Sequence, residues 1–338
     1  MRYFVLVGAV IATVAAWTGY WFYAAGLVEA DLARRAEQKG GPNSTGVQLV
    51  FESYEISGFP YRIQLTLNKP TIILHNETQE IRWQTDQIKA VGHPWQPRHV
   101  LFDLTGEHHL EADIDGQLRS LDLSSDAAQA SVETEANGRL QRLSLDIKNI
   151  LVRNQGLEAL RGQRLQVHVR QTPGSANSLD LALSGHTLEL LGEGLSELSF
   201  RQLPRNIKLL DLQSTVTELS ESLPQWRRQG GTVEVRKLQL HSGEMEIAAT
   251  GSLALDDQMR AIGALTAKIK GHDELLHMAV ANGGMDEDQA SVARAVLGLL
   301  AAAGGGMMSV PVRLQDGLLY LGPAAVARLS PLTTPGPN

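Results

Sequence analysis

The chain has 338 residues, no cysteine, 43% hydrophobic and 20% charged residues, and a formal net charge of −7. This length suits one large domain or two ordinary ones. The absence of cysteine excludes disulfide scaffolds and thiolate metal sites. A nucleic-acid partner is also excluded, because phosphate binding needs clustered lysine and arginine and the sequence contains no such patch.

Aromatic residues are concentrated at the start of the chain, where seven of the 17 lie within the first 23 residues. No charged residue occurs between Tyr3 and Val28, and this run is long enough to cross a hydrocarbon core of roughly 30 Å. The aromatic side chains at its far end include Trp17, Tyr20, Trp21 and Tyr23. Amphipathic rings prefer the headgroup level, so the pattern predicts a transmembrane signal anchor over residues 1–28.

Two alternatives to an uncleaved anchor remain open. Val14-Ala15-Ala16 imitates the small-residue site of a cleaved signal peptide, and a buried helix of a soluble protein would also be apolar. The lysine and arginine count does not settle the orientation, but a two-residue tail that stays inside while the body is exported is usual for such anchors. Residues 29–46 are expected to extend the helix and then form a linker at Gly40-Gly41-Pro42.

After Gly46 apolar and polar residues alternate, which is typical of strands with one apolar face. The clearest runs include Ile63/Leu65/Leu67, Leu143/Leu145/Ile147, Leu165/Val167/Val169 and Leu179/Leu181/Leu183. Turn signals lie between runs at Asp115-Gly116, Asn137-Gly138, Ser184-Gly185, Ser242-Gly243 and Asp316-Gly317. Such turns join antiparallel strands, so the pattern predicts a meander of roughly sixteen strands over residues 47–332. Residues 333–338 are expected to form a disordered tail.

So many strands cannot form a flat sheet, and the fold class we expect is mainly β, with the meander curled into a gutter or an open barrel-like sheet. Helical periodicity predicts a short helix over Thr217–Arg228 and a C-terminal helical hairpin over 275–281 and 286–303, packed on the sheet. Asp286 or Asp288 is the expected N-cap of its second arm. The expected apolar face of that arm comprises Val292, Val296, Leu299, Leu300 and Ala303.

Two motifs carry a resemblance to a known family. The first is Ile56-Ser57-Gly58-Phe59-Pro60-Tyr61-Arg62-Ile63, which follows the aromatic end of the anchor. The second is Leu314-Gln315-Asp316-Gly317-Leu318-Leu319-Tyr320-Leu321-Gly322-Pro323, followed by Leu329-Ser330-Pro331-Leu332. Together they resemble an uncharacterised envelope family of Gram-negative bacteria, domain of unknown function 2125. That family in turn resembles the AsmA-like group, whose membrane-anchored β-gutters are thought to hold or conduct lipid acyl chains.

The resemblance implies an inner-membrane protein with one span and its body in the periplasm, and it supplies no catalytic residues. From the residues themselves, Gly58 permits a bend and Pro60 cannot donate to a ladder, which predicts a turn that starts the sheet. No catalytic motif or phosphate-binding loop is present. His108 and His109 lie near Glu111 and Asp113, but adjacent histidines on a strand face opposite sides, so we expect no metal site and no cofactor.

The function we expect is therefore non-enzymatic: a membrane-anchored module whose aliphatic gutter binds lipid acyl chains in envelope lipid transport or homeostasis. The expected lining residues are Leu145, Leu165, Val167, Leu181 and Leu183. A structural or assembly factor with a packed core, acting through an envelope protein partner, is the alternative, and an enzyme comes third. The sequence leaves the oligomeric state open. Pocket volume would separate the first two, because packed interiors contain few voids.

Overall fold

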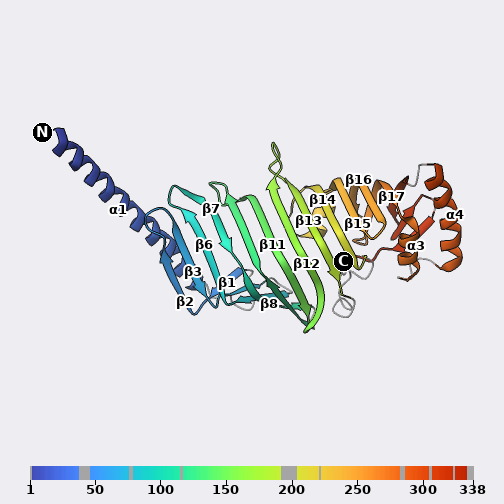
Figure 1. Ribbon diagram of the computed structural model, residues 1–338, viewed down its shortest axis with the longest axis horizontal. Helices are drawn as coiled ribbons and strands as arrows, with labels where there is room; N and C mark the ends of the chain where they lie inside the picture. The colour runs from blue at the N-terminus through green and yellow to red at the C-terminus, as the bar shows by residue number, and fades with distance from the viewer. Residues whose placement is uncertain are drawn as a thin grey trace. The chain divides into compact units, whose positions relative to one another are not determined.

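The computed structural model shows a long N-terminal helix followed by antiparallel strands and short helices (Figure 1). It describes residues 2–37, 46–75, 79–114, 117–191, 204–220, 222–281, 286–303, 307–322 and 324–332. The predicted linker at Gly40-Gly41-Pro42, the turn at Asp115-Gly116 and the tail at 333–338 lie outside these residues. Two compact units are present. Unit 1 comprises Met1–Arg139 with Val152–Gly156, and unit 2 comprises Leu140–Leu151 with Leu157–Asn338.

Helix α1 (Arg2–Glu37) belongs to unit 1 and is the one helix in the described residues that is long and apolar enough to cross a membrane. The side chains from Tyr3 to Val14 are exposed, whereas Trp21, Ala25 and Leu32 are buried. These three lie on one helical face, and Trp21 and Ala25 pack on Ile63 of β3. The apolar run predicted from the sequence therefore forms a single helix with a free first half and a docked second half.

In unit 1, most strands are separated from the next strand in sequence by only one or two residues. In chain order they are β1 (Gly46–Val50), β2 (Ser53–Ser57), β3 (Ile63–Asn68), β4 (Thr71–His75), β5 (Gln79–Thr85), β6 (Gln87–His93), β7 (Gln96–Asp103), β8 (Gly106–Ile114), β9 (Gln117–Ser125) and β10 (Ala127–Thr134). One antiparallel ladder runs β1–β4–β5–β8–β9 and the other runs β2–β3–β6–β7–β10. Unit 1 is thus a meander of long strands, each interrupted where it passes from one ladder to the other.

This line of interruptions explains why unit 1 has more strands than the alternation predicts. Pro70 separates β3 from β4, is fully buried, and has no N–H to donate to a ladder. Asp86 alone separates β5 from β6. The ladders stay in contact across the line, because the Lys69 amide donates to the Asp86 carbonyl at 2.7 Å.

Unit 2 continues the antiparallel meander, with each strand paired to the next. Its strands are β11 (Leu140–Asn154, of which Val152–Asn154 belongs to unit 1), β12 (Leu157–Gln171), β13 (Ser178–Leu190), β14 (Asn206–Thr217), β15 (Val233–Ser242), β16 (Met245–Leu255), β17 (Ala261–Lys270), β18 (Met308–Gln315), β19 (Leu318–Leu321) and β20 (Ala324–Arg328). None of the pairings between described strands joins β20 back to β12. The sheet is open and not strongly curled, so the predicted curled gutter is wrong in its curvature.

The sheet can stay open because helices of unit 2 cover part of its apolar face. In a closed barrel the sheet itself would enclose that face. The helices are α2 (Leu223–Arg228), α3 (His272–Ala281) and α4 (Glu287–Ala303). Leu276 of α3 and Ala290, Ala293 and Leu297 of α4 pack on β16 to β19 in the main core, as Figure 1 shows for α3 and α4 beside β17. This confirms the predicted hairpin, although its Gly283-Gly284 break lies outside the described residues.

Three finer predictions in unit 2 are wrong. The predicted helix over 217–228 begins only at Leu223, because Pro224 is tolerated in the first turn of a helix and not in its interior. Ser184-Gly185 lies within β13 and not at a turn. A Cβ on Gly185 would lie 2.6 Å from Leu188 Cδ1, so close packing explains the glycine. Val292 is 67% exposed, because the short side chains of Ala290 and Ala293 allow closer packing.

Candidate functional site

One face of the unit 2 sheet is apolar across all its central strands. Directly opposed residues in antiparallel strands point to the same face, so the registers define rows of side chains. One row comprises Val167, Leu183, Leu212, Leu238, Ala249, Ala267 and Val310. The next row comprises Val169, Leu181, Ser214, Val235, Gly251, Leu265 and Val312. This surface, called here the apolar face, is the candidate site.

The five predicted lining residues all lie on the apolar face. Val167 pairs with Leu183, Val169 pairs with Leu181, and Leu165 lies two residues before Val167 on β12. Leu145 lies on the same face as Leu165, because Asp146 accepts both hydrogen bonds of Arg164 at 2.8 Å and the neighbours Leu145 and Leu165 therefore both point to the opposite side of the sheet. All five are half-buried. Their role as a lipid lining stays a prediction.

The two ends of the apolar face differ in burial. At the β16–β18 end Ala267, Ile269 and Val310 are at most 2% exposed, because α3 and α4 pack on them. At the β12–β15 end the side chains of Val167, Leu183 and Leu212 remain half-buried. The second end therefore keeps apolar surface for a ligand.

An apolar pocket of about 390 Å³ lies on this face beside α2. Its floor is a further row of cross-strand neighbours, Val216, Val233 and Leu253. Leu219, Leu223 and Trp226 form a wall. The remaining lining residues are Ser220, Ser222, Ala254, Leu255, Ala261 and Leu332. Its volume falls in the range of roughly 300–1,000 Å³ typical of small-molecule sites, and its chemistry suits an aliphatic ligand.

Short-range interactions fix the wall of the pocket. Ser222 caps α2 by accepting the Gln225 amide through its side chain. The Trp226 indole N–H donates to the Thr217 carbonyl at 2.7 Å, which holds the ring over the end of β14. Gly231 lies under the ring, where a Cβ would come within 2.3 Å of Trp226 Nε1. Glycine at this position lets the indole lie flat on the chain.

The second family motif ends in a segment whose last described residue, Leu332, lines the pocket. Asp316 and Gly317 both have positive φ, 55° and 74°, and form the β18–β19 turn as predicted. Gly322 donates its amide to the Pro311 carbonyl at 2.8 Å, whereas Pro323 lies outside the described residues. The chain then returns so that the Leu332 amide donates to the Met259 carbonyl at 2.9 Å and its side chain lines the pocket.

The first family motif is the docking loop of α1. The Trp17 and Trp21 indoles donate to the Pro60 and Arg62 carbonyls at 3.0 and 2.9 Å. Phe59 stacks against Phe22, with ring centroids 6.0 Å apart, and meets Trp21 edge-on. Gly58 has φ of 103°, and a Cβ there would lie 2.7 Å from the Arg62 carbonyl oxygen. The turn predicted for Gly58-Phe59-Pro60-Tyr61 is confirmed, and it includes a cis Phe59–Pro60 bond.

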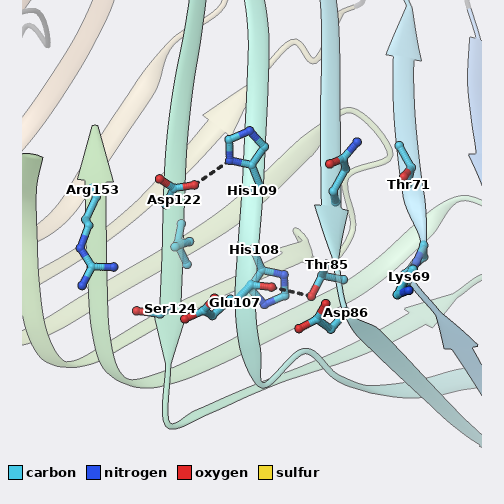
Figure 2. Close-up of a pocket in the computed structure, with 13 residues that line it drawn as sticks. Lys69, Thr71, Thr85, Asp86, Glu107, His108, His109, Asp122, Ser124 and Arg153 are labelled. Atoms are coloured by element: carbon cyan, nitrogen blue, oxygen red, sulfur yellow. Dashed lines mark hydrogen bonds and ion pairs between the residues drawn. The ribbon is translucent and has the colours of Figure 1, made fainter. Parts of the chain in front are cut away.

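Unit 1 has a larger but polar pocket of about 540 Å³ along the line where its ladders meet (Figure 2). His109 points at Asp122, with 2.6 Å between Nδ1 and Oδ1, and its Nε2 lies 3.2 Å from Glu111 Oε1. Hydrogen bonds to Asp122 and then to Glu111 raise the pKa of His109, because both carboxylates favour the imidazolium. Both ring nitrogens of this histidine thus already have carboxylate partners.

His108 faces the opposite way from His109, as expected for neighbours on a strand. The Trp83 indole donates to His108 Nδ1 at 3.1 Å, so its Nε2 carries the proton and donates to the Leu104 carbonyl. Both ring nitrogens are therefore used in holding the ladder junction. Within the described part of the chain no three histidine or acidic side chains are placed to bind a metal ion. The polar pocket offers no evident chemistry, and the apolar one is the better candidate.

The polar side of the unit 2 sheet is held by a buried carboxylate. Asp180 on β13 accepts from Arg170 on β12 at 3.0 Å, Thr215 on β14 at 2.9 Å and Arg236 on β15 at 2.8 Å. Burial alone would raise the pKa of Asp180. Hydrogen bonds from Arg236, Thr215 and Arg170 outweigh burial and lower this pKa to about 2. The ionised carboxylate thus cross-links four strands behind the candidate site.

Sequence reasoning located the apolar face but missed the pocket. The helical periodicity over Thr217–Arg228 predicts packing on a sheet, yet nothing in the pattern indicates the space left beneath Leu219, Leu223 and Trp226. The signal that could have found it is Pro224 with Gly230-Gly231, which limits α2 to six residues. So short a helix cannot cover the whole row beneath it.

A family of uncharacterised proteins conserved in bacteria, DUF2125, matches residues 21–330. The match begins at Trp21, the docked residue of α1, and ends beside the segment that carries Leu332. It contains the first motif and the stretch from Leu314 to Pro323 of the second. No curated protein matches the chain.

Proposed function

The chain belongs to the DUF2125 family of uncharacterised bacterial proteins, and from this premise we propose that it is a membrane-anchored, non-enzymatic protein that binds lipid acyl chains. Helix α1 anchors it in the bacterial inner membrane as a single span, with both units in the periplasm. The AsmA-like mode of action, in which a β-sheet shelters acyl chains in envelope lipid transport or homeostasis, is part of this proposal. Membrane lipid is the expected partner, an envelope protein a possible second one, and nucleic acid none.

The observation that carries the proposal is the apolar pocket of about 390 Å³ on a face with further half-buried aliphatic side chains. Burial of each methylene group contributes about 0.8 kcal/mol, so several methylenes give appreciable binding before ordering costs are subtracted. Leucine, valine and alanine provide no directional contacts, which suits a flexible chain of variable length. Ser220 and Ser222 are the polar side chains among the residues that line this pocket.

A matched pair of substitutions on β17 tests the proposal. Ala261 lines the pocket, whereas Ala264, three residues later, is exposed on the other face. Ala261→Phe should fill the pocket and reduce the phospholipid that copurifies with the full-length protein, measured by native mass spectrometry and lipid extraction. Ala264→Phe should leave it unchanged. Equal lipid content in both variants, or none in the unmodified protein, would refute acyl-chain binding at this pocket.

The packed end of the apolar face favours a second candidate, a structural or assembly factor. Ile269, Leu276 and Val310 are at most 1% exposed there. A protein of this kind would copurify with a protein partner and without stoichiometric lipid. The same mass spectra therefore distinguish the two functions.

The anchor has a separate test. Alkaline phosphatase fused after Asn338 should be active if the body is exported, and the mature protein should keep residues 3–25. An N-terminus at Trp17 would instead indicate cleavage after Ala16. That outcome would keep the docked part of α1 and remove the span.

A further inference from the structure

The docked half of α1 is hydrogen-bonded to two loops of unit 1. Besides the bonds from Trp17 and Trp21 to the loop 58–62, the Tyr20 hydroxyl donates to the Pro94 carbonyl at 2.8 Å in the β6–β7 loop, residues 93–96. Trp95 in that second loop lies 5.9 Å from Trp17 between ring centroids. Both loops are thus fixed at the level of residues 17–22 of the helix.

The free part of α1 is too short to span a membrane by itself. Residues 2–16, which precede the first docked residue, span about 22 Å at 1.5 Å per residue. A hydrocarbon core of roughly 30 Å needs about 20 helical residues. A span that starts at Tyr3 therefore ends near Phe22, beyond the point where both loops are attached.

The side chains on these loops suit the membrane surface. Phe59, Tyr61 and Trp95 are 50%, 72% and 52% exposed, although they are large and apolar or amphipathic. Arg62 and Arg98 beside them are also exposed. Aromatic rings prefer the headgroup level, and arginine there can reach lipid phosphates.

We infer that the loops 58–62 and 93–96 form an aromatic collar that enters the outer headgroup layer of the bilayer around α1. Unit 1 is then seated on the membrane surface, and α1 is not a flexible tether. This inference rests on the proposed membrane anchoring. The inference goes beyond the anchoring by assigning Phe59, Tyr61 and Trp95 to the lipid interface. With the collar at the headgroup level, the apolar part of α1 from Tyr3 to Phe22 provides about 30 Å, which is the length that a span needs.

The test uses the absence of cysteine, because each introduced cysteine then carries a unique nitroxide label. Tyr61→Cys probes the collar and Val10→Cys probes the free half of α1. Leu118→Cys, 66% exposed at the far end of the other ladder, is the matched control. The full chain is reconstituted in vesicles of phosphatidylethanolamine and phosphatidylglycerol. Collision of each label with lipid-soluble oxygen is then compared with collision with a water-soluble nickel chelate.

The inference expects an oxygen-to-nickel accessibility ratio above one at positions 10 and 61 and below one at position 118. A lipid-like ratio at position 10 with a water-like ratio at position 61 would overturn the collar and leave the anchor intact. A water-like ratio at position 10 would overturn both. If the label at position 61 disturbs folding, quenching by brominated lipid replaces it: the unmodified chain should lose more tryptophan fluorescence than Trp95→Phe, and equal losses would overturn the collar.

Discussion

The two ends of the apolar face in unit 2 have the same pattern of residues but a different environment. The β16–β18 end carries alanine, isoleucine and valine that α3 and α4 bury almost completely. At the β12–β15 end Val167, Leu183 and Leu212 occupy the same row as Ala267 and Val310 yet stay half-buried. The helices exclude solvent even from large side chains such as Ile269 and Met308, so the cover over the face, and not side-chain size, accounts for the difference.

The difference shows how one sheet can combine a packed core with a candidate ligand surface. The packed end holds the sheet together without a ligand. The half-buried end loses little stability by remaining open to solvent, because Asp180 cross-links its strands on the opposite face of the sheet. Three sets of variants of the detergent-solubilised chain test this division through the unfolding free energy, the melting temperature and the pH dependence of stability.

The largest effect is expected at the centre of the packed end. Leu276 on α3 is fully buried, so Leu276→Ala should lower the unfolding free energy by about 2–5 kcal/mol, through lost burial and the cavity it leaves. The control Val292→Ala, at a position 67% exposed on α4, should change it by less than about 0.5 kcal/mol. Similar losses in the two variants, measured by urea denaturation, would mean that α3 and α4 do not form a core.

A smaller effect should separate the two ends directly. Ile269→Trp adds volume where exposure is 1% and should cost about 1–3 kcal/mol. Leu181→Trp adds it at the half-buried end, where the melting temperature should stay nearly unchanged while copurifying lipid falls. A large fall in melting temperature for Leu181→Trp, with no lipid in the unmodified protein, would favour the packed structural alternative.

The smallest effect concerns the cross-link behind the half-buried end. The pKa of Asp180 falls from 3.8 to about 2 on folding, so its contribution is complete above pH 4 and is lost as pH drops toward 2. Asp180→Asn should therefore cost about 1–2 kcal/mol at neutral pH, and its difference from the unmodified chain should shrink below pH 4. A difference independent of pH between 6 and 2 would contradict ionisation as its cause.

Much of the fold could be predicted because its signals are local. The uncharged run of α1, the alternation of Val167 with polar neighbours and the turn at Asp316-Gly317 each act over a few residues. Predictions failed where packing between distant residues decides. Ser184-Gly185 has the composition of a turn, yet Leu188 requires the glycine inside a strand. Val292 matches a helical stripe, but the helix buries Ala290 and Ala293 instead.

The candidate site shows the same limit. Leu145, Leu165, Val167, Leu181 and Leu183 could be assigned to apolar strand faces from the alternation alone, because side chains in a strand point to its two sides in turn. Tertiary packing determined the registers that bring these faces together, which part α3 and α4 bury, and that a pocket remains beside α2. It also decided that Trp17, Tyr20 and Trp21 bind loops of unit 1. Periodicity reports which way a side chain points, whereas what lies opposite it depends on residues far away in the chain.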